Sequence, residues 1–388
     1  MSNLARSAML ARLSKLPQLP PELMDEGDED EEAGDSIGAL PSSMPPPSLN
    51  ISRAKTRQPR TPNPAFTPLS ASTYFAQAMQ ITLPTSKLDM RVYYTPPKPR
   101  NKDETGSILV CHHGAGFSAL SFACFAKEVE KYTNGELGVF SIDARRHGKT
   151  TPIEGVSDED LSLDVLVKDI AELLPTAFPD PSTAPTFFLV GHSMGGAVMV
   201  RVCPLLQDLK YRVGGVAVLD VVEGSALEAL PLMPMILSSR PTGFDSIEES
   251  IEWHVTANQI RNPLSARVSV PSLVVPAPSD PNALRAHAFV WRTPLGTTGP
   301  YWESWFRGLS SSFLKSRTAR LLVLAGTDRL DKELMIGQMQ GKFQMEVVPG
   351  TGHMLHEDDP VRLAEIVGEF WRRNEGVGLK GIKKVGEV

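Results

Sequence analysis

The feature that most constrains this chain is a Gly-x-Ser-x-Gly motif between two apolar runs. Residues 187–190 are aromatic or branched and predict a buried strand, and residues 197–206 suit a helix. Ser193 lies on the turn between them, and the flanking Gly191 and Gly195 tolerate strained dihedral angles and close backbone approach. Such a turn lifts a serine hydroxyl clear of a sheet, so the motif predicts a nucleophile elbow. The alternative is a tight turn with a capping serine.

Composition limits the classes of protein to which the chain can belong. At 388 residues it can bury a full core, as one large domain or two ordinary ones. The net charge of -6 argues against nucleic acid as the main partner. No apolar run has the length needed to cross a bilayer, and the N-terminus lacks a signal cleavage pattern. Three scattered cysteines, Cys111, Cys124 and Cys203, do not suit a disulfide framework or a zinc site. We expect a cytoplasmic protein with reduced thiols and no membrane partner.

Both ends of the chain are predicted to be loose. Residues 1–63 combine an acidic run at 25–35, a proline triplet and a basic stretch at 53–60, which favours a disordered tail. The alternative for the basic stretch is a nuclear-import signal. Residues 376–388 are predicted to form a flexible C-terminal tail.

Strands and helices alternate through the rest of the chain, after a first antiparallel hairpin. This rhythm predicts an α/β fold with a mostly parallel central sheet flanked by helices. Ser157 and Asp158 are predicted to cap the second helix. The expected strands are 78–83, 90–94, 108–111, 138–143, 187–190, 214–219, 320–325 and 344–348, and the expected helices are 120–132, 161–174, 197–206 and 361–373.

The regular succession of predicted strands is interrupted between residues 226 and 314. This segment predicts a cap insertion that divides the core into residues 64–225 and 315–375. Within it, Trp302, Trp305 and Phe306 are candidates for lining a substrate pocket, with packing inside the cap as the alternative.

A His-Gly-x-Gly turn at 113–116 follows the predicted strand 108–111. Hydrolases with a nucleophile elbow place an oxyanion donor there, and small residues let a backbone N–H face the substrate. We expect the N–H groups of Ala115 and Met194 to form the oxyanion hole, with an ordinary glycine turn as the alternative.

The remaining catalytic candidates also follow predicted strands. His353 comes after the last strand and is the expected general base, with a surface histidine as the alternative. Asp220 and Asp328 each end a strand, and motif position favours Asp328 as the acid that orients the histidine. The chain order Ser, Asp, His matches the α/β-hydrolase arrangement. The loop at 143–148, which contains His147, is expected to be structural.

Five segments together closely resemble the protein phosphatase methylesterases, over about residues 66–370. This family removes the methyl ester from the C-terminal leucine of the type 2A phosphatase catalytic subunit. The resemblance implies Asp220 as the acid, with Asp328 as the alternative. Ala115 stands where animal members carry glycine, and their long acidic cap loop is much shorter here. The segments are 191–196, 219–224, 301–309, 324–331 and 336–344.

The resemblance implies a serine carboxylesterase that demethylates the phosphatase catalytic subunit without a metal or organic cofactor. Two alternatives stay open: a phosphatase-docking inhibitory protein with secondary esterase activity, and a general carboxylesterase for small esters.

Overall fold

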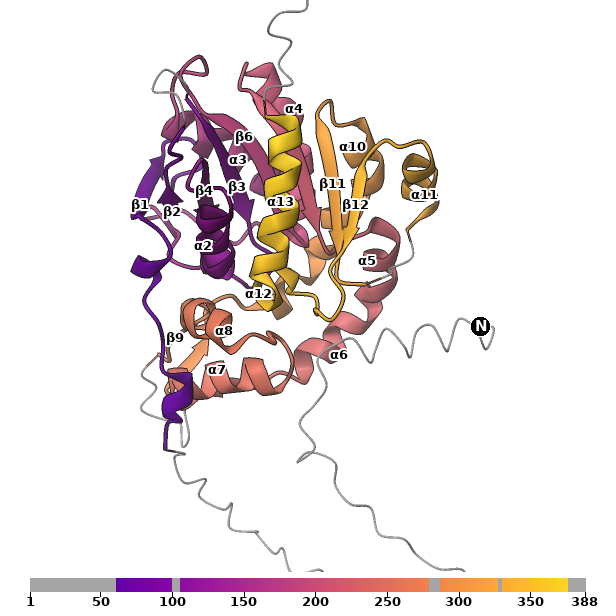
Figure 1. The fold of residues 1–388 in the computed structure, drawn as a ribbon. Coiled ribbons are helices and arrows are strands. Elements are labelled where there is room, and N and C mark those ends of the chain that lie inside the picture. Colours follow the sequence, from indigo (N-terminus) through magenta and orange to yellow (C-terminus); the bar gives the residue numbers. More distant parts are fainter. Residues whose placement is uncertain (1–60, 100–104, 279–286, 327–329, 376–388) are drawn as a thin grey trace, which may run out of the picture.

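The computed structural model describes residues 61–99, 105–278, 287–326 and 330–375. Its centre is a nine-stranded sheet with the order β1-β2-β4-β3-β6-β7-β11-β12, and β5 pairs with β2 (Figure 1). The strands of this sheet are β1 (Gln77–Leu83), β2 (Leu88–Thr95), β3 (Ser107–His112), β4 (Leu137–Ile142), β5 (Thr151–Pro152), β6 (Thr186–His192), β7 (Val213–Leu219), β11 (Ala319–Leu324) and β12 (Gln344–Val347).

Most of the sheet is parallel. The predicted hairpin is confirmed as the antiparallel pair β1 and β2, and β2 continues antiparallel to β4. From β4 through β3, β6, β7 and β11 to β12 every pairing is parallel. All six residues of β3 are buried, because a parallel strand covered on both faces can be continuously apolar. The predicted α/β class is therefore confirmed.

Helices cover both faces of this sheet, and the sheet separates the hydrophobic core into two clusters. Alternate residues of β3 enter different clusters: Val110 packs on the side of α3 and α4, and Leu109 packs on the side of α2 and α13. This alternation follows from the period of two along a strand. The helices that follow core strands are α2 (Ala123–Tyr132), α3 (Leu163–Ala177), α4 (Met194–Asp208), α11 (Lys332–Met339), α12 (Leu355–Asp358) and α13 (Pro360–Asn374), with the short η4 (Ala119–Phe122) before α2.

The predicted cap of α3 is wrong. The helix begins at Leu163 with Ser162 at its N-cap position. Ser157 instead accepts a hydrogen bond from the N–H of Glu159 within the preceding loop. Short polar side chains form such local turns as readily as helix caps, so their presence upstream does not locate the helix start.

Much of the chain between β7 and β11 lies at the carboxyl ends of the parallel strands (Figure 1). Its last two helices, α9 (Trp302–Phe306) and α10 (Leu309–Lys315), instead pack against α4 on one face of the sheet. The same part of the chain contains a three-stranded antiparallel sheet of order β8-β10-β9, which the sequence did not predict because these strands are only two or three residues long. The elements are α5 (Glu223–Ala229), η5 (Leu230–Leu232), α6 (Met233–Ser238), β8 (Gly243–Phe244), α7 (Ile247–Thr256), α8 (Pro263–Ser269), η6 (Val270–Ser272), β9 (Val274–Pro276), β10 (Phe289–Trp291), η7 (Leu295–Tyr301), α9 (Trp302–Phe306) and α10 (Leu309–Lys315).

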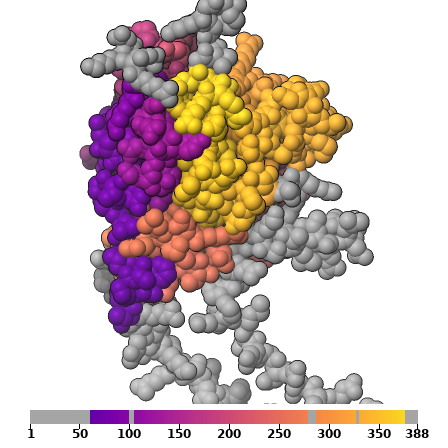
Figure 2. All heavy atoms as spheres, viewed as in Figure 1, coloured from indigo at the N-terminus to yellow at the C-terminus, as the bar shows by residue number. Residues whose placement is uncertain are grey.

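The segment before β1, with η2 (Pro64–Phe66) and η3 (Ala71–Thr73), runs along α7 and α8. The N–H of Leu69 donates to the carbonyl of Arg267 at 2.9 Å, and the Asn63 amide donates to Glu252 at 3.2 Å. Figure 2 shows the indigo atoms of this segment against the salmon atoms of the insertion. No helix in the described ranges is long and apolar enough to span a bilayer. The predicted tails, apart from residues 61–63, lie outside the described residues.

Candidate active site

The Gly-x-Ser-x-Gly motif forms the turn between β6 and α4. Ser193 has φ 50° and ψ -119°, a strained combination for a residue with a side chain. A Cβ on Gly191 would lie 2.1 Å from the carbonyl oxygen of Gly195, and a Cβ on Gly195 would lie 2.3 Å from that of His112. Both positions therefore require glycine. The Ser193 side chain makes no capping hydrogen bond to α4, so the turn presents the hydroxyl instead of using it as a helix cap.

The turn that follows β3 packs directly against this elbow. The N–H of Phe117 donates to the carbonyl of Gly114 at 3.2 Å, which closes a β-turn with Ala115 and Gly116 at its corners. Gly116 has φ 78°, the left-handed value that a type II turn requires at its third residue. A Cβ on Gly114 would lie 3.3 Å from the Cβ of Ser193. The turn and the serine are therefore immediate neighbours.

Two backbone N–H groups at this junction are available to a ligand. Met194 is the first residue of α4, so its N–H has no acceptor within the helix. Among the described residues, none accepts a hydrogen bond from the N–H of Ala115. Such N–H groups beside a serine can stabilise negative charge on a substrate oxygen.

His353 lies in the loop after β12 and is hydrogen-bonded to Asp220. Its Nδ1 is 2.8 Å from Asp220 Oδ2, and Asp220 Oδ1 accepts the N–H of Ala325 at 2.7 Å. Nε2 of His192, the residue before the serine, lies 2.8 Å from the carbonyl oxygen of His353. The His353 side chain is 54% exposed and that of Asp220 only 10%. The imidazole can therefore meet a substrate while its carboxylate partner is kept from water.

Of the two acid candidates, the structure describes only one beside the histidine. Asp220 follows β7 with φ 50°, and this turn aims its carboxylate at the loop after β12. Asp328, which motif position favoured, lies outside the described residues. The structure therefore places Asp220, the acid that the family resemblance implied, beside His353, and its catalytic role stays a prediction.

Five buried histidines surround these groups, and this set is called the histidine cluster below. Burial lowers the pKa of His147 to about 4 and that of His356 to about 3, and it holds the pKa of His192 well below its ordinary value. The cluster is therefore neutral near pH 7 and places no second positive charge beside His353. Its members are His112, His113, His147, His192 and His356.

The loop at 143–148 is structural, as predicted. Arg145 donates two hydrogen bonds to the buried Asp169 of α3, at 2.6 and 2.8 Å. Asp143 accepts the N–H groups of Ala119 and Lys149 at 2.7 and 2.8 Å. Burial raises the pKa of Asp143 to about 6.

The three aromatic candidates of the insertion lie around α9. Trp305 and Phe306 are buried in the core cluster that contains α3 and α4, and the Trp305 indole donates to the carbonyl of Leu161 at 2.7 Å. Trp302 is partly buried and donates to Thr298. Contact with a substrate stays a prediction for all three. The sequence analysis did not identify Leu295 as a neighbour of the turn at 113–116. A Cβ on Gly116 would lie 2.7 Å from Cδ1 of Leu295, and a lone leucine in a loop carries no sequence signal for that placement.

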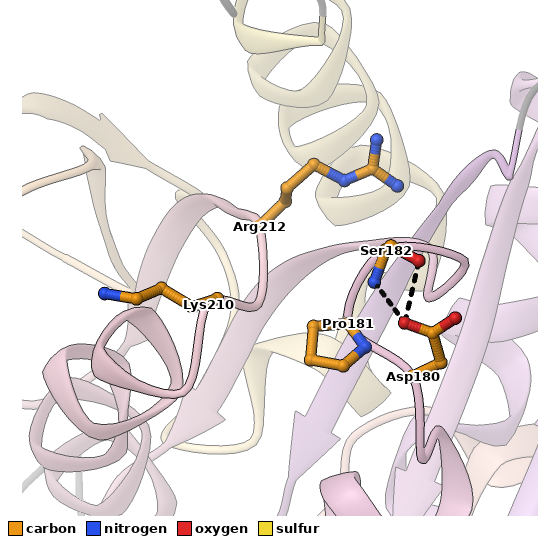
Figure 3. Close-up of a pocket in the computed structure, with 5 residues that line it drawn as sticks. All are labelled: Asp180, Pro181, Ser182, Lys210 and Arg212. Atoms are coloured by element: carbon orange, nitrogen blue, oxygen red, sulfur yellow. Dashed lines mark hydrogen bonds between the residues drawn. The ribbon is translucent and has the colours of Figure 1, made fainter.

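A hollow of about 410 Å³ lies elsewhere on the surface, lined by the loops that precede β6 and β7 (Figure 3). These loops enter the amino ends of the strands, opposite the edge that carries Ser193, so the hollow is separate from the candidate site. Within the described ranges, no three His, Cys, Asp or Glu side chains are grouped to hold a metal ion. The lining residues are Asp180, Pro181, Ser182, Lys210 and Arg212.

Comparisons with known proteins identify the family of the chain. Residues 109–366 match the model of the alpha/beta hydrolase family. The chain is 46% identical to a protein phosphatase methylesterase 1 of Cryptococcus neoformans, over 97% of this chain and 94% of that protein. It is 42% identical to the protein of the same name from Aspergillus oryzae, over 100% of this chain and 93% of the relative.

Solved structures show the same fold at lower identity. E-2-(acetamidomethylene)succinate hydrolase superposes with a TM-score of 0.57 at 17% identity, over 76% of this chain and 99% of that one. An esterase of Mycobacterium tuberculosis superposes with a TM-score of 0.53 at 19% identity, over 76% of this chain and 91% of that one. At these identities the likeness establishes the fold alone.

Proposed function

Because the chain belongs to the α/β-hydrolases and, within them, to the protein phosphatase methylesterases, it is a carboxylic ester hydrolase, and we propose that its substrate is the C-terminal leucine methyl ester of the protein phosphatase 2A catalytic subunit. The observation that carries the chemistry is the hydrogen bond of 2.8 Å between His353 and Asp220, beside the strained turn of Ser193. The relatives' name supports a protein phosphatase as the substrate.

In this proposal Ser193 is the nucleophile and His353 the general base. Asp220 accepts the Nδ1–H of His353, which leaves Nε2 free to take the serine proton and stabilises the imidazolium that forms. The serine oxygen bonds to the ester carbonyl carbon, and the N–H groups of Ala115 and Met194 donate to the developing oxyanion. The bond to the methoxy oxygen then breaks, and His353 returns the proton so that methanol leaves.

A water molecule completes the cycle by the same groups. It gives a proton to His353 and adds to the acyl carbon, the bond to the serine oxygen breaks, and the proton returns to Ser193. The product is a free leucine carboxylate. We also propose that the enzyme acts in the cytoplasm.

The test is methyl loss from purified, methylated phosphatase catalytic subunit, with p-nitrophenyl acetate assayed in parallel. Ser193→Ala is expected to lower kcat on both esters by about 10⁶-fold, by analogy with other serine triads. Ser182→Ala, an exposed serine in the hollow of Figure 3, is the matched control and should leave both rates unchanged.

The outcomes separate the candidate functions. Loss of both activities in Ser193→Ala alone supports the methylesterase. Hydrolysis of the small ester without methyl loss would favour a general carboxylesterase. Tight binding of the phosphatase with neither ester hydrolysed would favour a docking inhibitor.

A further inference from the structure

The oxyanion turn and the loop at 143–148 are joined by a reciprocal pair of histidines. The N–H of Gly116 donates to Nε2 of His147 at 2.9 Å, and the N–H of Ala144 donates to Nε2 of His113 at 3.0 Å. The two rings are buried, with their centroids 4.9 Å apart. Each histidine thus binds a backbone N–H of the other loop.

These contacts determine which nitrogen carries the proton. A backbone N–H can only donate, so Nε2 of each ring must be the unprotonated acceptor. The proton therefore lies on Nδ1, where His113 donates to the carbonyl of Gly114 and His147 to that of Arg145, each at 2.8 Å. Both rings are neutral in this arrangement, as their burial favours.

The same contacts aim the N–H of Ala115. That N–H and the carbonyl of Gly114 belong to one planar trans peptide, so they point in opposite directions. The Gly114 carbonyl is held by two donors, His113 Nδ1 and the N–H of Phe117. His147 holds the next peptide through the N–H of Gly116. Both peptide planes beside Ala115 are therefore fixed by a histidine.

The loop that supplies His147 is itself anchored. Arg145, whose carbonyl accepts the His147 proton, is paired with the buried Asp169 of α3. The carbonyl of Arg146 accepts the hydroxyl of Thr293 from the insertion at 2.8 Å. The oxyanion turn is thus tied through His147 to the rigid core.

From this geometry we infer that His113 and His147 are positioning residues that orient the Ala115 N–H of the oxyanion hole. The inference rests on the proposed function, because it assumes that this N–H stabilises the transition state. The two rings act through different nitrogens: His113 donates through Nδ1 to the carbonyl of Gly114, and His147 accepts through Nε2 from the N–H of Gly116.

The test uses two amide substitutions at each position, because Asn places its amide near Nδ1 of histidine and Gln places its amide near Nε2. His113→Asn keeps the donor to Gly114 and His113→Gln loses it. His147→Gln keeps the acceptor for Gly116 and His147→Asn loses it. The harmful substitution should therefore differ between the two positions. His113→Gln and His147→Asn, which lose the contact, are expected to lower kcat by about 10²-fold, the cost of a small misplacement. His113→Asn and His147→Gln, which keep the contact, should stay within about threefold of the parent. KM should change little in all four, because the oxyanion forms only in the transition state.

The controls separate positioning from stability. His254, a buried histidine of α7 with Nδ1 at 2.7 Å from the carbonyl oxygen of Ser250, is changed to Asn and to Gln, and neither should alter kcat. Urea unfolding of each variant measures stability alongside p-nitrophenyl acetate kinetics. Equal kcat losses for Asn and Gln at both positions, or no losses, would overturn the inference while Ser193→Ala still abolishes activity. Activity that survives Ser193→Ala would instead refute the proposed function itself.

Discussion

Replacing Asp220 by asparagine tests the triad most sharply, because the structure fixes how the new amide must lie. The N–H of Ala325 donates to Oδ1 of Asp220 and can only donate, so the amide oxygen of the asparagine takes that place. The amide NH₂ then faces Nδ1 of His353. A donor there forces Nδ1 to become the acceptor, which moves the imidazole proton to Nε2. Nε2 can then no longer accept the proton of Ser193.

The expected loss is large because no water can replace the carboxylate. The Asp220 side chain is only 10% exposed and both its oxygens are occupied. The wrong tautomer costs about 10⁴-fold in kcat in a comparable triad, which corresponds to about 5.4 kcal/mol of transition-state stabilisation. KM should change little, because the substrate binds before the proton moves.

The assay is steady-state hydrolysis of p-nitrophenyl acetate and of the methylated phosphatase subunit. Asp245→Asn is the matched control: Asp245 forms an Asp–His contact of 3.1 Å with His287 in the insertion, and its loss should leave kcat unchanged. Asp328→Asn is measured beside it. The reasoning is refuted if Asp220→Asn keeps more than about a tenth of kcat, or if Asp328→Asn is the more damaging change.

Three further predictions concern stability and the elbow. The six buried histidines have lowered pKa values, so below about pH 6.5 the unfolded chain takes up protons that the folded chain does not. Each such proton lowers the free energy of unfolding by about 1.4 kcal/mol for each pH unit of acidification. Three carboxyls with pKa values raised by burial, those of Asp143, Glu357 and Asp358, oppose this trend and are outnumbered. The urea midpoint should therefore fall from pH 7 to pH 5, and a midpoint that rises would contradict the assignment. Arg145→Met leaves Asp169 buried without its partner and should lower the free energy of unfolding by about 3–5 kcal/mol in urea; a loss below 1 kcal/mol would contradict this. Gly195→Ala puts a Cβ 2.3 Å from the His112 carbonyl and should reduce kcat by at least about 10²-fold, whereas Gly296→Ala, with open space around it, should not.

Much of the fold was predictable because it depends on local patterns. A strand covered on both faces appears in the sequence as a short apolar run, and the bounds of β3, β6 and β7 were predicted to within two residues. The elbow was found because glycine is required on both sides of Ser193, and that requirement is visible in the sequence. The short strands β8, β9 and β10 were missed because pairs and triplets of residues have no period to detect.

The sequence alone could not choose between the two candidate acids. Asp220 and Asp328 both follow strands that end at the same edge of the sheet, so motif position cannot separate them. Asp220 and His353 are 133 residues apart, and no local pattern connects them. Asp220 is placed beside His353 by the positive φ of its turn together with the N–H of Ala325, and both are properties of the folded chain.

The protonated nitrogens of His113 and His147 could not be predicted from the sequence either. His147 could be assigned to a structural loop because Asp and Arg side chains stand beside it in the sequence. Its task depends on Gly116, which is 31 residues away, and the same separation divides His113 from Ala144. The type of a residue is local information, but the nitrogen that carries its proton is decided by partners across the fold. The chemistry of the elbow can therefore be predicted from Ser193 and its glycines, whereas the direction of the Ala115 N–H follows only from the atoms that hold its neighbours.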